Sequence, residues 1–311
     1  MAEQDLLLPS LSKTDNIKER VMRIKIITMA IAAMLSSTVA LSAQQSSVVQ
    51  ADIDAYQGYF LERFPNVDGL QGFSKGAYAM NEDKMMQFEA VMEMPPFEDL
   101  VEKGGELWEK PFANGNTFSS CFEEEPSLIR AAYPRWNSAK GKVDTLEQAL
   151  IDCLVSNGEK KWGTGKGKHA WVAAHLTTLG EGTFINVIVP EGDEAALAAY
   201  NDGKKHYYAK RGQLNLSCAN CHVEGAGMRV RGNTLSPGLG QTTHFPVWRG
   251  KWARKTNGVD GFGTIQRRYG GCNKQVRAKP FKRHKSEYDN LEFFHTAMSN
   301  GMEITTTEYR E

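Results

Sequence analysis

The segment Leu214–His222 reads LNLSCANCH and contains the motif C-x-x-C-H, which is formed by Cys218, Cys221 and His222. This spacing is the signature of covalent c-type haem attachment. Two cysteines separated by two residues can bond to the two vinyl groups of one porphyrin, and the adjacent histidine then lies under the iron as its proximal ligand. The motif therefore predicts one covalently bound haem, attached at Cys218 and Cys221 and ligated by His222.

The surrounding residues argue against two other uses of a cysteine pair. A structural zinc site needs a second ligand pair at matching spacing, which the sequence lacks. A thioredoxin-type redox pair stands at the end of a strand that opens a βαβ unit, whereas five glycines follow here between residues 225 and 240. Glycine lets a backbone approach a flat ligand closely, so this glycine-rich segment is expected to lie against the porphyrin.

The N-terminal residues predict export, which haem attachment requires. Residues 22–25 (MRIK) form a short basic start, Ile26–Val39 is mostly apolar, and small residues precede a cleavage site after Ala43. Residues 1–43 are therefore predicted to be an N-terminal extension and signal peptide, and the mature chain is expected in the periplasm. An uncleaved N-terminal anchor is the alternative. The rest of the sequence has no apolar run long enough to cross a bilayer, so stable membrane insertion is not expected.

The formal net charge of zero conceals two oppositely charged segments. Between Glu82 and Glu125 there are twelve acidic residues and three lysines, and between Arg249 and Lys285 there are twelve Lys or Arg residues and one acidic residue. Such asymmetry bears on partners rather than on fold. In an exported haem protein the basic segment suits a small anion or an acidic protein, and nucleic acid is not an expected partner.

A second segment resembles the haem motif. Phe118–Phe122 (FSSCF) matches CANCH, with phenylalanine in place of the first cysteine and of the histidine. Each of the two segments is followed by a predicted helix that ends in Ser-Asn-Gly, at residues 146–158 and 291–301. The chain is therefore predicted to be mainly α, with a few short strands, and to contain two cytochrome-c-like domains in tandem. Residues 44–159 would form a domain without haem, and residues 160–311 the haem-binding cytochrome c domain.

Three cysteines lie outside the haem motif. Cys121 and Cys153 belong to the same half, and an oxidising compartment favours a disulfide between them. A disulfide that involves Cys272 is the alternative. Cys272 follows the residues RRYGG. If Cys272 is unpaired, the cations of this run would lower its pKa and make it a candidate distal ligand of the iron. Met228 and His244 are the other candidates for that position.

Helices are predicted where apolar residues recur at helical spacing. These segments are residues 52–64, 81–94, 97–110 and 193–210. The apolar run at 184–189 predicts a short strand, with a possible partner strand at 171–176. Candidate walls of the haem pocket are the aromatic residues Phe245, Trp248 and Trp252.

Two long runs resemble the SoxA family, which provides the cytochrome subunit of the SoxAX L-cysteine S-thiosulfotransferase of sulfur-oxidising bacteria. They are Tyr207–His222 (YYAKRGQLNLSCANCH) and Ser236–Arg249 (SPGLGQTTHFPVWR). The RRYGGC run at 267–272 and the segment from Asn290 to Gly301 match as well. The resemblance is dense from about residue 161 to Gly301 and thinner before it. Because FSSCF replaces the first haem motif, the resemblance implies the mono-haem type.

The resemblance also implies roles for particular residues. The family cysteine that matches Cys272 is the active-site residue and the distal haem ligand, and the arginine that matches Arg268 contacts the anionic substrate. The implied reaction joins thiosulfate oxidatively to a cysteine of the SoxYZ carrier. The implied partner is SoxX, a second cytochrome subunit that brings another c-type haem.

Two functions from other classes stay open at this point. The first is a mono-haem electron-transfer cytochrome without substrate chemistry, in which Met228, Met298 or Met302 would be the distal ligand. The second is a haem subunit that docks or senses without catalysing a reaction.

Overall fold

Helix α2 (Ser47–Arg63) is the first element of the computed structural model, which describes residues 44–230 and 232–310. The predicted signal peptide and its cleavage site lie outside the described residues. One face of α2 is buried because apolar side chains recur along it every three or four residues. These residues are Val49, Ile53, Tyr56 and Phe60. The helix is longer than the predicted 52–64 because the buried face already begins at Val49.

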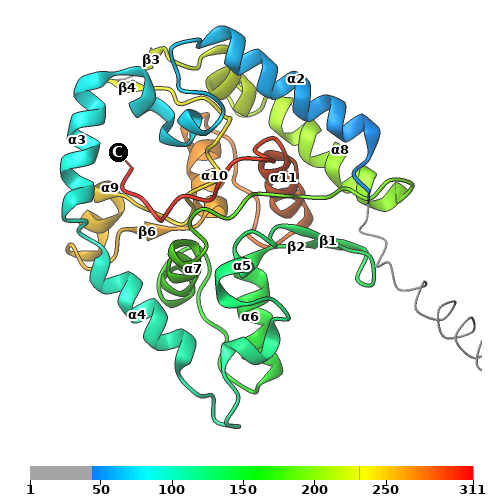
Figure 1. Cartoon of the computed structure of the whole chain (residues 1–311), viewed down its shortest axis with the longest axis vertical. Helices are drawn as coiled ribbons and strands as arrows, with labels where there is room; N and C mark the ends of the chain where they lie inside the picture. Colours follow the sequence, from blue (N-terminus) through cyan, green and yellow to red (C-terminus); the bar gives the residue numbers. More distant parts are fainter. Residues whose placement is uncertain (1–43, 231, 311) are drawn as a thin grey trace, which may run out of the picture. The chain divides into compact units, whose positions relative to one another are not determined.

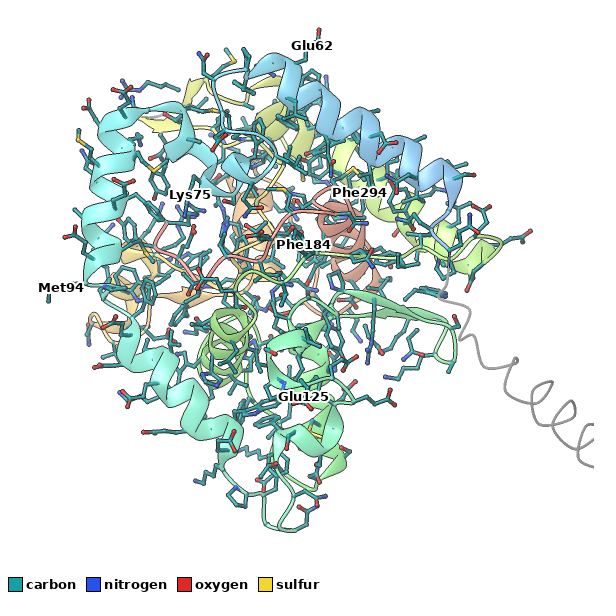
Figure 2. The ribbon with its side chains drawn as sticks, in the orientation of Figure 1. Glu62, Lys75, Met94, Glu125, Phe184 and Phe294 are labelled. Atoms are coloured by element: carbon teal, nitrogen blue, oxygen red, sulfur yellow. A yellow bond between two sulfur atoms is a disulfide. The ribbon has the colours of Figure 1, made fainter. Side chains whose placement is uncertain are left out.

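Helices α8 (Glu194–Tyr208) and α11 (Ser286–Ala297) pack closely against each other (Figure 1). A Cβ atom added at Gly203 of α8 would lie 2.0 Å from the carbonyl oxygen of Asn290 in α11. The contact between the two backbones therefore requires glycine at this position. Phe294 of α11, labelled in Figure 2, is fully buried beside this contact. The helices predicted at 193–210 and near 291–301 are confirmed.

Helices α4 (Glu98–Glu109) and α7 (Lys168–Leu179) form the second close pair (Figure 1). Gly104 of α4 allows this packing, because a Cβ atom there would lie 2.2 Å from the carbonyl oxygen of Trp171. Helix α7 is buried along most of its length, which explains why its sequence shows no polar face.

The predicted strand pair 171–176 and 184–189 is wrong. Residues 171–176 lie inside α7, because a short apolar run fits a buried helix as well as a strand. Residues 184–189 are extended but form no ladder; an isolated bridge joins Phe184 to Glu303, and the Val187 N–H donates to a side chain. Phe184 itself, labelled in Figure 2, is exposed.

Other helical elements lie between the helices named above. They are η1 (Gln71–Met80), α3 (Glu82–Glu93), η2 (Phe118–Cys121), α5 (Pro126–Ile129), α6 (Leu146–Ser156), η3 (Asn220–Glu224), α9 (Gly250–Ala253), η4 (Arg254–Thr256) and α10 (Ile265–Gln275). The strands of the described residues pair antiparallel, two by two. The pairs are β1 (Arg135–Asn137) with β2 (Lys142–Asp144), β3 (Arg229–Val230) with β4 (Asn233–Thr234), and β5 (Val247–Trp248) with β6 (Phe262–Gly263). The predicted fold class, mainly α with a few short strands, is confirmed, as are the helices predicted at 81–94, 97–110 and 146–158.

The buried apolar side chains gather in clusters that do not follow the order of the chain. One cluster joins α4, η2, α6 and α7, and the largest joins α2 to α8 and α11. Helix α7 therefore packs with elements that precede residue 159, and α2 packs with elements that follow it. The division into domains 44–159 and 160–311 stays a prediction. Within residues 44–230 and 232–310, no helix has the length and apolar character that a membrane crossing requires.

Candidate haem and thiol site

One pocket brings the haem motif together with the third free cysteine. Its volume is about 880 Å³, including the part open to solvent, which is within the range of cofactor sites. Cys218, Cys221 and His222 line it from one side, and Arg268 and Cys272 line it from α10. The apolar part of its wall includes Tyr207, Leu216, Leu235, Phe245, Ile265 and Leu291. The structure thus collects the predicted haem-attachment and catalytic residues in one place.

The turn that contains the first attachment cysteine, Cys218, is held by reciprocal hydrogen bonds between Ser217 and Asn220. Asn220 accepts at Oδ1 from the Ser217 backbone N–H at 3.0 Å, and Ser217 Oγ accepts from the Asn220 N–H at 3.0 Å. Burial raises the pKa of Cys218 to about 12, and burial also raises the pKa of Cys221. Both side chains are therefore neutral thiols at neutral pH and carry no disulfide. Thiols, rather than a disulfide, are what thioether attachment requires.

The imidazole of His222 is oriented as a haem ligand needs it to be. Its Nδ1 lies 2.9 Å from the carbonyl oxygen of Ser236. A hydrogen bond at Nδ1 fixes the ring and leaves Nε2 available to a metal. The turn that carries His222 is anchored by Arg63 of α2, whose guanidinium donates to the carbonyl oxygens of Val223, Glu224 and Ala226. Together these contacts fit an axial ligand of haem iron.

Cys272 reaches the same pocket from α10. Thr264 caps this helix by accepting at Oγ1 from the Arg267 N–H, and Cys272 lies two turns later. The Cys272 thiol is a hydrogen-bond partner of the His222 imidazole. Burial alone would raise the pKa of Cys272, but the charge of Arg268 and the contact with His222 outweigh burial and lower it to about 7. A thiol of this kind is a thiolate nucleophile and iron ligand near neutral pH.

The competing distal ligands lie elsewhere. Met228 is 60% exposed, and Met298 and Met302 are buried in the core cluster of α2, α8 and α11. His244 is a hydrogen-bond partner of the Arg310 side chain. Of the described residues that line the pocket, Cys272 is the one that combines a free thiol with a contact to His222.

The aromatic walls are partly as predicted. Phe245 lines the pocket. Trp248 packs instead against Phe97, with ring centroids 6.3 Å apart. Trp252 makes a cation–π contact with Arg267, whose guanidinium carbon lies 4.2 Å from the centroid of the Trp252 ring. Leu235 of the glycine-rich segment lines the pocket, and so does Gln241, which directly follows this segment.

Arg249 is a site residue that the sequence did not single out. Its positive charge, like that of Arg268, lowers the pKa of Cys272. Its Nε is buried and has no hydrogen-bond partner among the described residues. Arg249 follows β5, whereas Arg268 and Cys272 are on α10, so only the fold brings the three together. The signal available in the sequence was the basic segment that begins at Arg249.

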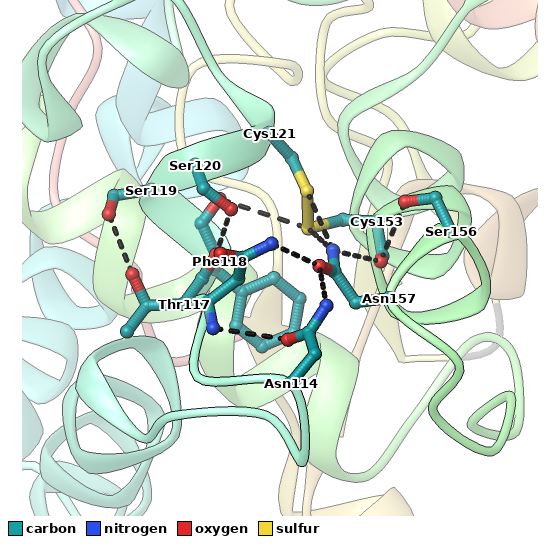
Figure 3. The surroundings of a disulfide bond; sticks show 10 residues. Asn114, Thr117, Phe118, Ser119, Ser120, Cys121, Cys153, Ser156 and Asn157 are labelled. Carbon is teal, nitrogen blue, oxygen red and sulfur yellow. Dashed lines mark hydrogen bonds between the residues drawn. A yellow bond between two sulfur atoms is a disulfide. The ribbon is translucent and has the colours of Figure 1, made fainter.

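The FSSCF segment at 118–122, which the sequence predicts to correspond to the haem motif, contributes a cysteine to a disulfide. Cys121 at the end of η2 is bonded to Cys153 of α6, and the Asn157 side chain donates to the Cys153 carbonyl oxygen (Figure 3). Phe118, which stands where the first haem cysteine would be, is buried and stacks on Trp108 at a centroid distance of 5.9 Å. Further rings pack around Phe118 and Trp108, namely Phe112, Phe122 and Trp162. Side chains thus fill the space beside this disulfide.

Comparison with known proteins places the chain in a family. It is 44% identical over 272 residues to the L-cysteine S-thiosulfotransferase subunit SoxA of Chlorobaculum thiosulfatiphilum, a match that covers 88% of this chain and 91% of that protein. This chain belongs to the SoxA family. The SoxA subunit of Allochromatium vinosum is 42% identical over 250 residues, with 80% of this chain and 86% of that protein covered. The resemblance seen in the sequence is therefore confirmed.

Two further comparisons agree with membership of the SoxA family. The family model described as SoxA/TsdA, cytochrome c domain, matches residues 103–185. The crystal structure of SoxXA from P. pantotrophus matches with a TM-score of 0.61 and 29% identity, covering 70% of this chain and 79% of that chain. As a cytochrome c family, SoxA implies a c-type haem, and the pocket around Cys218, Cys221 and His222 fits one.

Proposed function

We propose that this SoxA chain is the catalytic cytochrome subunit of a periplasmic L-cysteine S-thiosulfotransferase. It joins thiosulfate oxidatively to a cysteine of the SoxYZ carrier. The observation that carries the proposal is the position of Cys272, an unpaired thiol with a pKa near 7 that lines the pocket of the haem motif and contacts His222. A thiol without substrate chemistry would be expected in apolar surroundings, where its pKa is raised.

One haem would be held by this chain, attached through Cys218 and Cys221, with His222 and Cys272 as the residues that would ligate its iron. When bound, a haem accepts electrons one at a time. The disulfide and packed aromatic rings around Phe118 support a single haem, because they occupy the corresponding place in the first half. The neutral thiols of the haem motif and the Nδ1 contact of His222 support attachment in the second half.

The side chains of the pocket suit a sulfur-containing anion. Cys272 provides a sulfur nucleophile at neutral pH, and Arg268 presents a planar fork of donors that matches a sulfonate group. Overall, a sulfur–sulfur bond forms between the carrier thiol and thiosulfate, and one proton and two electrons leave. Because one haem takes one electron at a time, a second acceptor is needed. The SoxX cytochrome subunit supplies it as the partner in a heterodimer.

The proposal is tested by an assay that contains the purified chain, a SoxX partner, a SoxYZ carrier and thiosulfate. We expect thiosulfate-dependent reduction of haem and a carrier that gains the mass of a thiosulfate-derived group. The assay without carrier should show no sustained reduction. Reduction by unrelated electron donors without any mass change on the carrier would instead support an electron-transfer cytochrome.

Replacing Arg268 with alanine is expected to weaken the use of thiosulfate. A hydrogen bond to a charged group contributes about 1.5–3 kcal/mol, so kcat/KM for thiosulfate should fall roughly 10- to 100-fold, mainly through KM. Lys274→Ala is the matched control, because Lys274 is exposed on the same helix and carries the same charge. Equal effects of the two substitutions would mean that Arg268 acts only through net charge.

A further inference from the structure

The Nδ1 atom of His222 has two neighbours. The carbonyl oxygen of Ser236 lies 2.9 Å away, and the Nε2 atom of the Gln241 side-chain amide lies 3.1 Å away. Backbone and side-chain hydrogen bonds hold the loop that carries both residues. The Gly238 N–H donates to the His222 carbonyl oxygen at 2.7 Å. The Gly240 N–H donates to the hydroxyl of Ser299, which follows α11, at 3.2 Å. The contact between Gln241 and His222 is thus built into the loop.

The proton on the imidazole decides which way the Gln241 amide turns. An imidazole that binds iron through Nε2 carries its proton on Nδ1. That proton suits the Ser236 carbonyl oxygen, but it would face the NH2 group of Gln241 donor to donor. The amide oxygen and nitrogen occupy nearly the same space, so a rotation of the amide by about 180° places Oε1 against Nδ1 instead. The proton then has two acceptors, one of them a side chain.

We propose that Gln241 is a positioning residue for the haem ligand, and that its amide oxygen accepts a share of the His222 Nδ1 proton. Two acceptors withdraw this proton further than one and make the imidazole a more basic ligand. A more basic ligand stabilises the ferric state relative to the ferrous state, so Gln241 keeps the reduction potential low. The inference rests on haem attachment and ligation by His222 as proposed above, but not on the sulfur-transfer chemistry.

The test measures the reduction potential of the haem-loaded protein by spectroelectrochemistry in the wild type and in Gln241→Leu. Leucine keeps the approximate volume but accepts no hydrogen bond. The equilibrium constant for reduction should rise about tenfold, which is ~59 mV for one electron. Gln241→Glu retains an acceptor and adds negative charge, so its potential should equal or fall below that of the wild type. The g values of the ferric EPR spectrum should shift in the leucine variant.

Gln71→Leu is the matched control, because Gln71 bonds to the backbone of Glu303 and is not among the described residues that line the pocket. Its potential should equal that of the wild type. An unchanged potential in Gln241→Leu, or an equal rise in Gln241→Glu or Gln71→Leu, would overturn the role of Gln241. If Gln241→Leu is purified without haem, the reduction potential of Gln241→Ala is compared with that of the wild type instead. A wild-type protein without covalent haem would refute the proposed function instead.

Discussion

Replacing Cys272 with alanine is expected to lower the transfer of thiosulfate to the carrier by at least about 1,000-fold, because removal of a nucleophile leaves only binding and positioning effects. The Cys272 thiol is the free sulfur of the pocket that lies outside the haem motif, and its pKa of about 7 makes it reactive at neutral pH. Haem content should be unchanged, because in the proposed function the thioethers of Cys218 and Cys221, and not Cys272, attach the porphyrin. Turnover is measured as thiosulfate-dependent mass gain on the carrier.

The conservative variant Cys272→Ser separates loss of the nucleophile from loss of the fold. A hydroxyl is close in size to the thiol but is not ionised near pH 7, so transfer should be as low as in the alanine variant. Far-ultraviolet circular dichroism and the haem absorption of both variants should match those of the wild type except for bands that report distal ligation. Transfer within tenfold of the wild-type rate in either variant would remove Cys272 from the proposed chemistry.

Removing the disulfide is expected to lower the free energy of unfolding by about 3–4 kcal/mol. The loop closed by Cys121 and Cys153 has a sequence separation of 32, and the chain-entropy relation gives this magnitude for a loop of that length. The variant Cys121→Ser/Cys153→Ala suits the two environments, since Cys121 is exposed and Cys153 is buried. Denaturant unfolding followed by tryptophan fluorescence measures the effect, because Trp108 lies in the same cluster.

A reductant provides the control for this experiment. Dithiothreitol should lower the stability of the wild type toward that of the double variant and should leave the variant itself unchanged. Haem content should be the same in both proteins, because the disulfide lies outside the haem pocket. A wild type that resists denaturant equally with and without reductant would show that the disulfide contributes little to stability.

The parts of the site that are local in sequence could be predicted. The spacing of Cys218, Cys221 and His222 is a requirement of one chemical attachment, so it is readable without a fold. The reactive character of Cys272 followed from nearby cations on the same helix, and the structure places Arg268 beside it. Helices whose apolar residues recur at helical spacing, such as α3, were also readable.

The parts that depend on long-range contacts could not be predicted. Gln241 reaches the pocket from a loop, and Arg249 lowers the pKa of Cys272 from the turn that follows β5. The sequence neighbours of these two residues do not indicate what their side chains meet. Helix α7 was mistaken for a strand because its burial on nearly all sides removes the polar positions that mark a helical period. The packing of α2 against α8 and α11 likewise joins residues from opposite ends of the chain.

The axial ligands of the haem iron decide between a catalytic thiolate and a simple electron carrier. Low-temperature EPR of the oxidised protein is the most direct measurement. We expect the low-spin ferric signal of thiolate and imidazole ligation in the wild type and its loss in Cys272→Ala. A thioether and imidazole signal in the wild type, unchanged in Cys272→Ala, would contradict the role of Cys272 as distal ligand and the sulfur chemistry built on it.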